Sequence, residues 1–208
     1  MTVERDRLVG PALLVAPQLL GAVLVSDLDD ARVAVRLTEV EAYEGVEDPA
    51  SHAFRGRTAR TAVMFGPPGH LYCYFTYGMH WCANVVCGTD GVAAAVLLRA
   101  GEVIDGLDAA KHRRRAARRD VDLARGPARL ASCLALGRAA NGLDLCTADS
   151  AVRLTSMPAR RARGILAGPR VGITVATEQA WRFWLSEEPS VSAFKPGGRK
   201  RARNATAD

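Results

Sequence analysis

Glu39-Val40-Glu41-Ala42-Tyr43 and Leu71-Tyr72-Cys73-Tyr74-Phe75-Thr76-Tyr77-Gly78-Met79 are the two stretches around which the sequence is organised, both within residues 37–84. Residues 32–41 predict a β-strand, and at a period of two Glu39 and Glu41 fall on the same face as its apolar residues. An ionised carboxylate that leaves water costs several kcal/mol unless it finds a partner or its pKa rises. This pattern therefore predicts a buried functional carboxylate. The alternative is a strand that ends after Leu37, with both glutamates in solvent.

The composition is that of one globular domain with a basic surface. Of the 208 residues, 49% are hydrophobic and 24% are charged, which supplies a core and excludes global disorder. The 28 lysines and arginines exceed the 22 acidic residues, and the net charge of +6 favours a polyanionic partner. The five cysteines form no CxxC pair and predict reduced thiols in a cytoplasmic protein. Prolines and glycines break the apolar stretch 8–25, which therefore predicts core rather than a membrane span.

The expected elements are short strands, a few helices and one long loop. Strands at 22–25 and 32–41 flank turn residues and predict an antiparallel hairpin. Strands at 71–76 and 80–87 predict a second hairpin with a three-residue tip. The other expected elements are a helix at 16–20 with Pro17 in its first turn, a loop at 44–70, a strand at 92–98 that ends at Arg99, a basic helix at 103–119 whose arginines face solvent, a helix at 128–136 closed by Gly137, strands at 152–155 and 171–176, a surface loop at 156–168 and a mobile basic tail at 195–203.

Several classes of catalytic site lack their sequence signatures in this chain. A zinc deaminase needs an H-x-E and a P-C-x-x-C motif, but no histidine is followed at the second position by glutamate and no two cysteines are three apart. Gly66-Pro67-Pro68-Gly69 is not a nucleotide-binding loop, because its prolines lack the N–H groups that bind phosphate. A G-x-S-x-G nucleophile motif is also missing. We therefore expect neither a metal nor a cofactor.

The four tyrosines of the chain lie close in sequence to a carboxylate or to one another. Tyr43 follows Glu41 by two residues, and the other three lie at 72–77, although only 6% of the chain is aromatic. Together with His52 and Asn84, these rings predict a pocket that stacks a flat, electron-rich ligand.

Two of these tyrosines have different interpretations. Tyr72 has no further argument and is interpreted as an ordinary strand tyrosine. Tyr77 stands at the expected hairpin tip before a glycine, where a large ring gains little from folding and is exposed. An exposed ring on a basic protein is the kind of side chain that wedges between base pairs.

Taken together, these motifs resemble the alkyladenine (3-methyladenine) DNA glycosylase family in its bacterial form, over residues 15–195. The stretches that carry the resemblance are Glu39-Val40-Glu41-Ala42-Tyr43, Glu47-Asp48-Pro49-Ala50-Ser51-His52, Met64-Phe65, Gly69-His70-Leu71-Tyr72-Cys73-Tyr74, Tyr77-Gly78-Met79, Cys82-Ala83-Asn84 and Val96-Leu97-Leu98-Arg99-Ala100.

The resemblance implies a mixed α/β (α+β) fold: a single glycosylase domain over residues 1–195 with a curved antiparallel β-sheet flanked by helices, then a basic tail at 196–208. It implies that Glu41 is the base that activates water, and that Arg99 and the backbone carbonyl of Val171 help to hold that water. The other implied site residues are a base-stacking pocket of Tyr43, His52 and Tyr74, an intercalating Tyr77, and Asn84, which clashes with the 2-amino group of guanine.

The implied reaction is excision of a damaged purine, such as 3-methyladenine, hypoxanthine or ethenoadenine, from a flipped nucleotide in double-stranded DNA. No lysine lies in residues 1–110 to act as the amine nucleophile of a strand-cutting enzyme, so a monofunctional enzyme that leaves an abasic site is expected. The expected protein is a cytoplasmic, nucleoid-associated bacterial monomer. Two alternatives stay open: a non-catalytic nucleic-acid-binding module that stacks an unpaired base, which does not need Glu41, and a hydrolase of free nucleosides.

Overall fold

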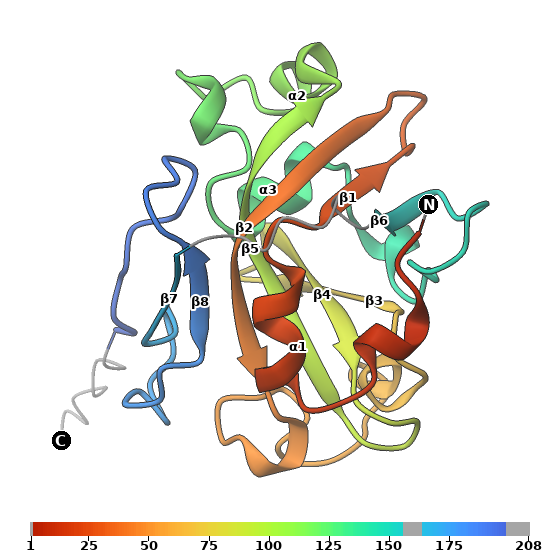
Figure 1. Ribbon diagram of the computed structural model, residues 1–208, viewed down its shortest axis with the longest axis vertical. Helices are drawn as coiled ribbons and strands as arrows, with labels where there is room; N and C mark the ends of the chain where they lie inside the picture. The colour runs from red at the N-terminus through yellow and green to blue at the C-terminus, as the bar shows by residue number, and fades with distance from the viewer. Residues whose placement is uncertain (1, 156–163, 199–208) are drawn as a thin grey trace, which may run out of the picture.

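The computed structural model describes residues 2–155 and 164–198, which form a mixed α+β fold around one curved antiparallel sheet (Figure 1). This confirms the expected fold class. The strands are β1 (Val23–Ser26), β2 (Val33–Tyr43), β3 (Leu71–Thr76), β4 (His80–Cys87), β5 (Ala94–Asp105), β6 (Val152–Thr155), β7 (Ile165–Gly168) and β8 (Arg182–Leu185). The α-helices are α1 (Ala12–Leu19), α2 (Leu107–Arg113) and α3 (Pro127–Cys133), and the 3-10 helices are Arg5–Leu8, Gly45–Glu47, Ala62–Phe65, Asp120–Asp122 and Arg138–Ala140.

Strand β2 is the centre of the sheet. The strand order is β3-β4-β5-β2-β1-β6, and β8 also pairs with β2 while β7 pairs with β8. Along one edge β2 pairs with β5, the two lying side by side in Figure 1. Along its other edge β2 pairs first with β1 and then, at Glu39 to Glu41, with β8. The carboxylate stretch therefore has a strand on both sides.

One face of the sheet carries the main hydrophobic core. Alternate residues of β3, β4 and β5 point into this core, and helices α1 and α3 pack against it. The side chains between them point to the opposite face, where a smaller apolar cluster includes Met64, Tyr72 and Val86. Most of the buried apolar side chains thus lie on one face of the sheet, which leaves the second face available for polar side chains.

A pair of β-bulges moves the carboxylates to that second face. Leu37 lies opposite Gly101 and Glu39 opposite Ala100, so Thr38 is an extra residue in β2. Val35 and Leu37 point into the core before the bulge, whereas Val40 and Ala42 do so after it. The prediction that Glu39 and Glu41 share the face of the preceding apolar residues is therefore wrong, because a bulge changes the alternation of the strand. Their burial, in contrast, is confirmed, since both are 0% exposed.

The expected hairpins are present. Strands β3 and β4 have the expected bounds, and β1 pairs antiparallel with β2. Helix α1 begins at Ala12 rather than at residue 16, so Pro17 lies inside the helix. Helix α3 ends at Cys133 rather than at 136, because Ala135 already adopts a left-handed conformation with φ of 54°.

Three other expectations are wrong. Strand β5 does not end at Arg99 but continues to Asp105, which leaves only Leu107–Arg113 for the expected basic helix at 103–119. Residues 171–176 are not a strand, since positive φ angles at Gly172 and Ala176 interrupt an extended chain. The late strands are instead β7 and β8, and β7 occupies part of the expected loop at 156–168. Residues 156–163 of that loop and 199–208 of the basic tail lie outside the described residues.

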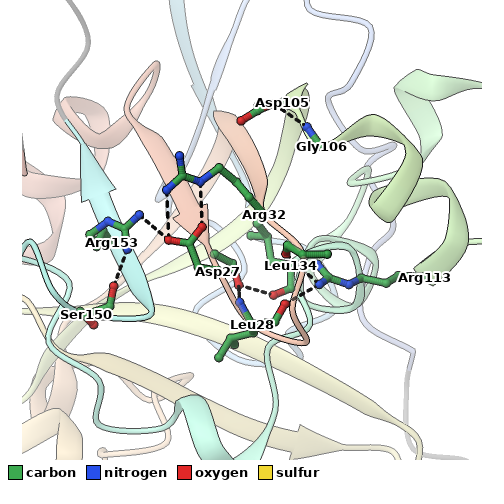
Figure 2. Close-up of polar contacts among 11 residues, drawn as sticks. Asp27, Leu28, Arg32, Asp105, Gly106, Arg113, Leu134, Ser150 and Arg153 are labelled. Carbon is green, nitrogen blue, oxygen red and sulfur yellow. Dashed lines mark hydrogen bonds and ion pairs between the residues drawn. The ribbon is translucent and has the colours of Figure 1, made fainter.

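The basic run after α2 has a structural part as well as a solvated one. Arg113 donates to the carbonyl oxygens of Cys133 (3.1 Å), Leu28 (2.6 Å) and Ala31 (3.1 Å), which ties α2 to α3 and to the β1–β2 turn (Figure 2). Residues 115, 118 and 119 are exposed, as expected of a solvated face. None of the helices within the described residues is both long enough and apolar enough to span a membrane.

Candidate active site

A cavity of about 240 Å³ opens on the face of the sheet opposite the main core. The residues that border it come from β2, β3, β4 and β5, the 3-10 helix Ala62–Phe65, the start of α3, the loop at 50–52, the β3–β4 tip and the loop at 171–173. Seven of the eight site residues expected from the sequence border this one cavity: Tyr43, His52, Tyr74, Tyr77, Asn84, Arg99 and Val171.

Aromatic rings form one side of the cavity. The rings of His52 and Tyr74 meet edge to face with centroids 4.5 Å apart, and Tyr72 lies 5.6 Å from Tyr74. Tyr72 is buried, and its hydroxyl lies 3.2 Å from Nδ1 of His52. The interpretation of Tyr72 as an ordinary strand tyrosine is therefore incomplete, because it orients a ring of the cavity. Burial and the charge of Arg60 lower the pKa of His52 to about 4, so the imidazole is neutral near pH 7.

Glu41 lies behind the cavity wall with its carboxylate fully buried. Oε1 accepts a hydrogen bond from the backbone N–H of Val171 (2.7 Å) and faces Nη1 of Arg99 at 3.2 Å. Oε2 accepts from the hydroxyl of Tyr43 at 2.9 Å. All three of these partners border the cavity. The part of Val171 that contacts Glu41 is its N–H, whereas the resemblance assigned a role to its carbonyl.

The electrostatics of Glu41 balance burial against these donors. Burial raises the pKa of Glu41, and the charge of Arg99, the Val171 N–H and the Tyr43 hydroxyl oppose that rise. Burial likewise raises the pKa of the Tyr43 phenol well above its usual range, so this hydroxyl keeps its proton and donates. Arg99 is itself almost fully buried and contacts Glu39 as well as Glu41. The Arg99 guanidinium beside Glu41 favours the charged form of that carboxylate.

Asn84 and Tyr77 occupy opposite extremes of exposure. Asn84 is buried in β4, and its Nδ2 donates to the carbonyl of Tyr72 at 3.0 Å, which fixes the amide at the cavity wall. Tyr77 is 82% exposed at the hairpin tip, which confirms the expected exposure. Its φ of 51° is uncommon for a bulky residue, and strained positions of this kind cluster at functional sites.

Arg170 is a component of the site that sequence reasoning missed. It is buried, binds both carboxylate oxygens of Asp48, and donates to the carbonyl of Ala42 at 3.0 Å. Its guanidinium lies 4.6 Å from the ring centroid of Tyr43 and 4.9 Å from that of Trp181. Arg170 therefore supports the Tyr43 ring from behind. Asp48 and Ala42 lie more than 120 residues before Arg170 in the sequence, so no local spacing indicates these contacts.

Comparison with known proteins agrees with this geometry. The family model described as methylpurine-DNA glycosylase matches residues 6–189. A protein of Streptomyces avermitilis is 49% identical over 204 residues, covering 96% of this chain and 94% of its own length. A protein of Nocardia farcinica is 51% identical (86% and 85%), and one of Mycobacterium leprae is 46% identical (98% and 94%). Each is named as a provisional 3-methyladenine DNA glycosylase. The chain therefore belongs to the methylpurine-DNA glycosylase family and is a DNA glycosylase.

Proposed function

We propose that this protein flips a damaged purine of the 3-methyladenine, hypoxanthine or ethenoadenine type out of duplex DNA and hydrolyses its N-glycosidic bond with a water activated by Glu41. The observation that carries the proposal is a buried carboxylate, held by Arg99, directly behind a cavity bordered by aromatic rings. An extruded base needs such a slot, and a hydrolytic reaction needs such a base.

The hydrogen bonds of Glu41 support its role as the base. A carboxylate has about four acceptor positions. Among the described residues, Tyr43 and Val171 donate hydrogen bonds to Glu41, and Arg99 forms an ion pair with it. Val171 and Arg99 both contact Oε1, which leaves an acceptor position on Oε2 beside the Tyr43 hydroxyl. A water at this position gives a proton to Glu41 as its oxygen attacks C1′. The purine leaves with the electron pair of the broken C1′–N bond.

Charge stabilisation is the second task of the same group. The sugar develops positive charge as the glycosidic bond breaks, and the Glu41 carboxylate stabilises that charge. In this proposal Arg99 keeps Glu41 ionised, and the backbone carbonyl of Val171 accepts a second hydrogen bond from the water. None of the residues that border the cavity is a lysine, which fits a monofunctional enzyme with an abasic product.

The remaining residues bind and select the nucleotide. Tyr43, His52 and Tyr74 stack on the extruded base, and a neutral His52 suits this role near pH 7. Asn84, fixed by its bond to the Tyr72 carbonyl, excludes guanine through contact with the 2-amino group. Tyr77 fills the gap that the flipped nucleotide leaves in the duplex. The enzyme acts as a monomer in this proposal, because one chain supplies every residue named.

The substitution Glu41→Gln tests the proposal. It keeps the shape of the side chain and removes the negative charge, so we expect binding to lesion-containing duplex to persist while base release falls by about 10²-fold or more. Base release is measured as alkali-labile sites in oligonucleotides that each carry one lesion. The matched control is Glu44→Gln, because Glu44 is close in sequence but accepts from the N–H of Leu13 outside the cavity. Unchanged base release by Glu41→Gln would contradict the proposal and favour a non-catalytic binding module.

A further inference from the structure

The three nitrogens of the Arg99 guanidinium have three different partners. Nε donates to Oε1 of Glu39 at 2.8 Å, and Nη2 donates to Oγ of Ser192 at 3.3 Å. Nη1 faces Oε1 of Glu41 at 3.2 Å. A guanidinium is planar and rigid, so fixing Nε and Nη2 also fixes the direction of Nη1. Glu39 and Ser192 thus hold one edge of the group whose other side faces Glu41.

Glu39 is fully occupied by this arrangement. It is 0% exposed, and it lies outside the cavity lining. Oε1 accepts from Arg99, from Oγ of Ser192 at 2.9 Å and from Nη1 of Arg182 at 3.3 Å, and Oε2 accepts from the N–H of Ser192 at 2.7 Å. A carboxylate has about four acceptor positions, and these four donors leave Glu39 none with which to activate water. Its position between Arg99 and Arg182 instead fits a role in orienting cations.

Ser192 belongs to a segment that lies beyond residue 189, where the match to the family model ends. We name residues 190–197 the C-terminal strap. The strap is anchored to the domain before and after Ser192: Oγ of Ser190 lies 2.8 Å from Oγ of Thr38, and the carbonyl of Val191 accepts from Nε of Arg125 at 2.8 Å. The hydroxyl that reaches Arg99 is therefore delivered by a fixed backbone.

The strap also contacts the cavity wall that holds the other donor to Glu41. The N–H of Gly172 donates to the carbonyl of Lys195 at 3.1 Å. Gly197 approaches the carbonyl of Ile173 so closely that an added Cβ would lie 2.1 Å from its oxygen. Val171, whose N–H donates to Glu41, is the neighbour of Gly172. Both partners of Oε1 of Glu41, the Val171 N–H and the Arg99 guanidinium, are thus connected to this one segment.

We propose that Glu39 and Ser192 are positioning residues that aim the Arg99 guanidinium at Glu41, and that the C-terminal strap is the element that brings Ser192 to it. The inference rests on the proposed function, because it assigns a purpose to the orientation of Arg99 toward a catalytic Glu41. Neither residue contacts the substrate in this proposal. Small displacements of a catalytic group reduce rate much more than they reduce stability.

The experiment compares Ser192→Ala with two other variants of the full chain. Ser192→Ala removes the hydroxyl that bonds Arg99 and Glu39 but keeps the backbone N–H that donates to Glu39. Ser192→Thr restores a hydroxyl. Ser26→Ala is the matched control, because it removes a buried serine hydroxyl that donates to the carbonyl of Leu134 and contacts neither the strap nor the cavity. The readouts are the single-turnover rate of base release, the affinity for lesion-containing duplex, and the thermal unfolding midpoint.

We expect Ser192→Ala to lower the single-turnover rate about tenfold to a hundredfold with unchanged affinity for the duplex. Ser192→Thr should recover most of the rate, and Ser26→Ala should keep the wild-type rate even if its unfolding midpoint falls. The inference is overturned if Ser192→Ala releases base at the wild-type rate, or if the two alanine variants lose rate in proportion to lost stability. A failure of Glu41→Gln to lose activity refutes the proposed function itself, so the two failures are distinguishable.

Discussion

The proposed catalytic base, Glu41, is fully buried. Two hydrogen-bond donors and one guanidinium, from three segments of the chain, compensate for that burial. Arg99 is the only full positive charge among these groups. The charge of Arg99 is the main influence that opposes the effect of burial on the pKa of Glu41, and Glu39 and Ser192 bind that guanidinium in turn.

This dependence predicts a specific pH profile. The base acts only when ionised, so base release falls as the pH decreases through the pKa of Glu41, which burial raises above its ordinary value. Arg99→Gln removes the charge that opposes this rise, so the pKa of Glu41 increases further. We expect the acidic limb of the single-turnover rate to move to higher pH in Arg99→Gln, with a lower rate at pH 7. The rate is measured from pH 4 to 9 at saturating enzyme.

The control for that profile is an exposed arginine that does not border the cavity. Glu39 raises the pKa of Glu41 slightly, while Tyr43 remains protonated over this range of pH. Arg115→Gln removes an exposed arginine of the segment after α2 and should leave the acidic limb in place. An acidic limb at the same pH in the wild type and in Arg99→Gln would mean that another group is the base.

At the scale of elements, features that depend on local sequence could be predicted, whereas features that depend on pairing between distant strands could not. The β3–β4 hairpin has its expected bounds because alternation and a Tyr-Gly tip lie within 17 residues. The predicted face of Glu39 and Glu41 was wrong because it depends on bulges at Thr38 and Arg99. These bulges form only where β2 pairs with β5, about 60 residues away in sequence. The aromatic cluster of the candidate site was predictable because its residues are close in sequence. The roles of Arg170 and Ser192 and the pairing of β8 depend instead on contacts between residues more than 100 positions apart.

The hairpin tip makes a prediction of its own. Tyr77 has a positive φ and a solvated ring, an arrangement that gains nothing for folding and that suits insertion into a base stack. We expect Tyr77→Ala to reduce base release from duplex DNA about tenfold or more, since the wedge that holds the nucleotide out is lost. A lesion in a single strand is already unpaired, so its excision should change much less. Both substrates are compared in single-turnover assays.

The control for the wedge is an equally exposed apolar residue elsewhere. Leu14 on α1 is 63% exposed, and Leu14→Ala should leave both substrates unaffected. Equal losses on duplex and single-stranded DNA in Tyr77→Ala would assign Tyr77 to the binding of the base rather than to the opening of the duplex. A normal rate on both substrates would leave the strained tip without a role in the reaction.

At the scale of the whole molecule, the curved sheet separates stability from chemistry. The helices and the main apolar cluster cover one face, and the cavity, the carboxylates and the arginine network lie on the other. This division explains how two fully buried glutamates coexist with an ordinary hydrophobic core. We therefore expect the basic residues beside the cavity to contact the duplex.

We expect only some of the basic residues behind the net charge of +6 to contact DNA phosphates. The salt dependence of DNA binding can identify them. Arg55, Arg57 and Arg60 are exposed on the segment beside the cavity, with Arg60 lying 5.6 Å over the Tyr74 ring. In Figure 1 this orange segment lies at the end of the molecule opposite α2. Each arginine that contacts a phosphate adds about 0.9 to the slope of log K against log salt concentration. Replacing all three by alanine should therefore flatten the slope measured on undamaged duplex.

A second triple variant removes the same charge from the far end of the molecule. Arg115, Arg118 and Arg119 follow α2 and are exposed, so their replacement by alanine changes the net charge equally. If phosphates bind only around the cavity, this variant keeps the wild-type slope because its arginines release no condensed counterions from DNA. Equal slopes in the two triple variants would mean that the net charge, and not the arginines beside the cavity, attracts the duplex. The slopes are obtained by fluorescence anisotropy between 50 and 200 mM salt, a range over which about six phosphate contacts change affinity by orders of magnitude.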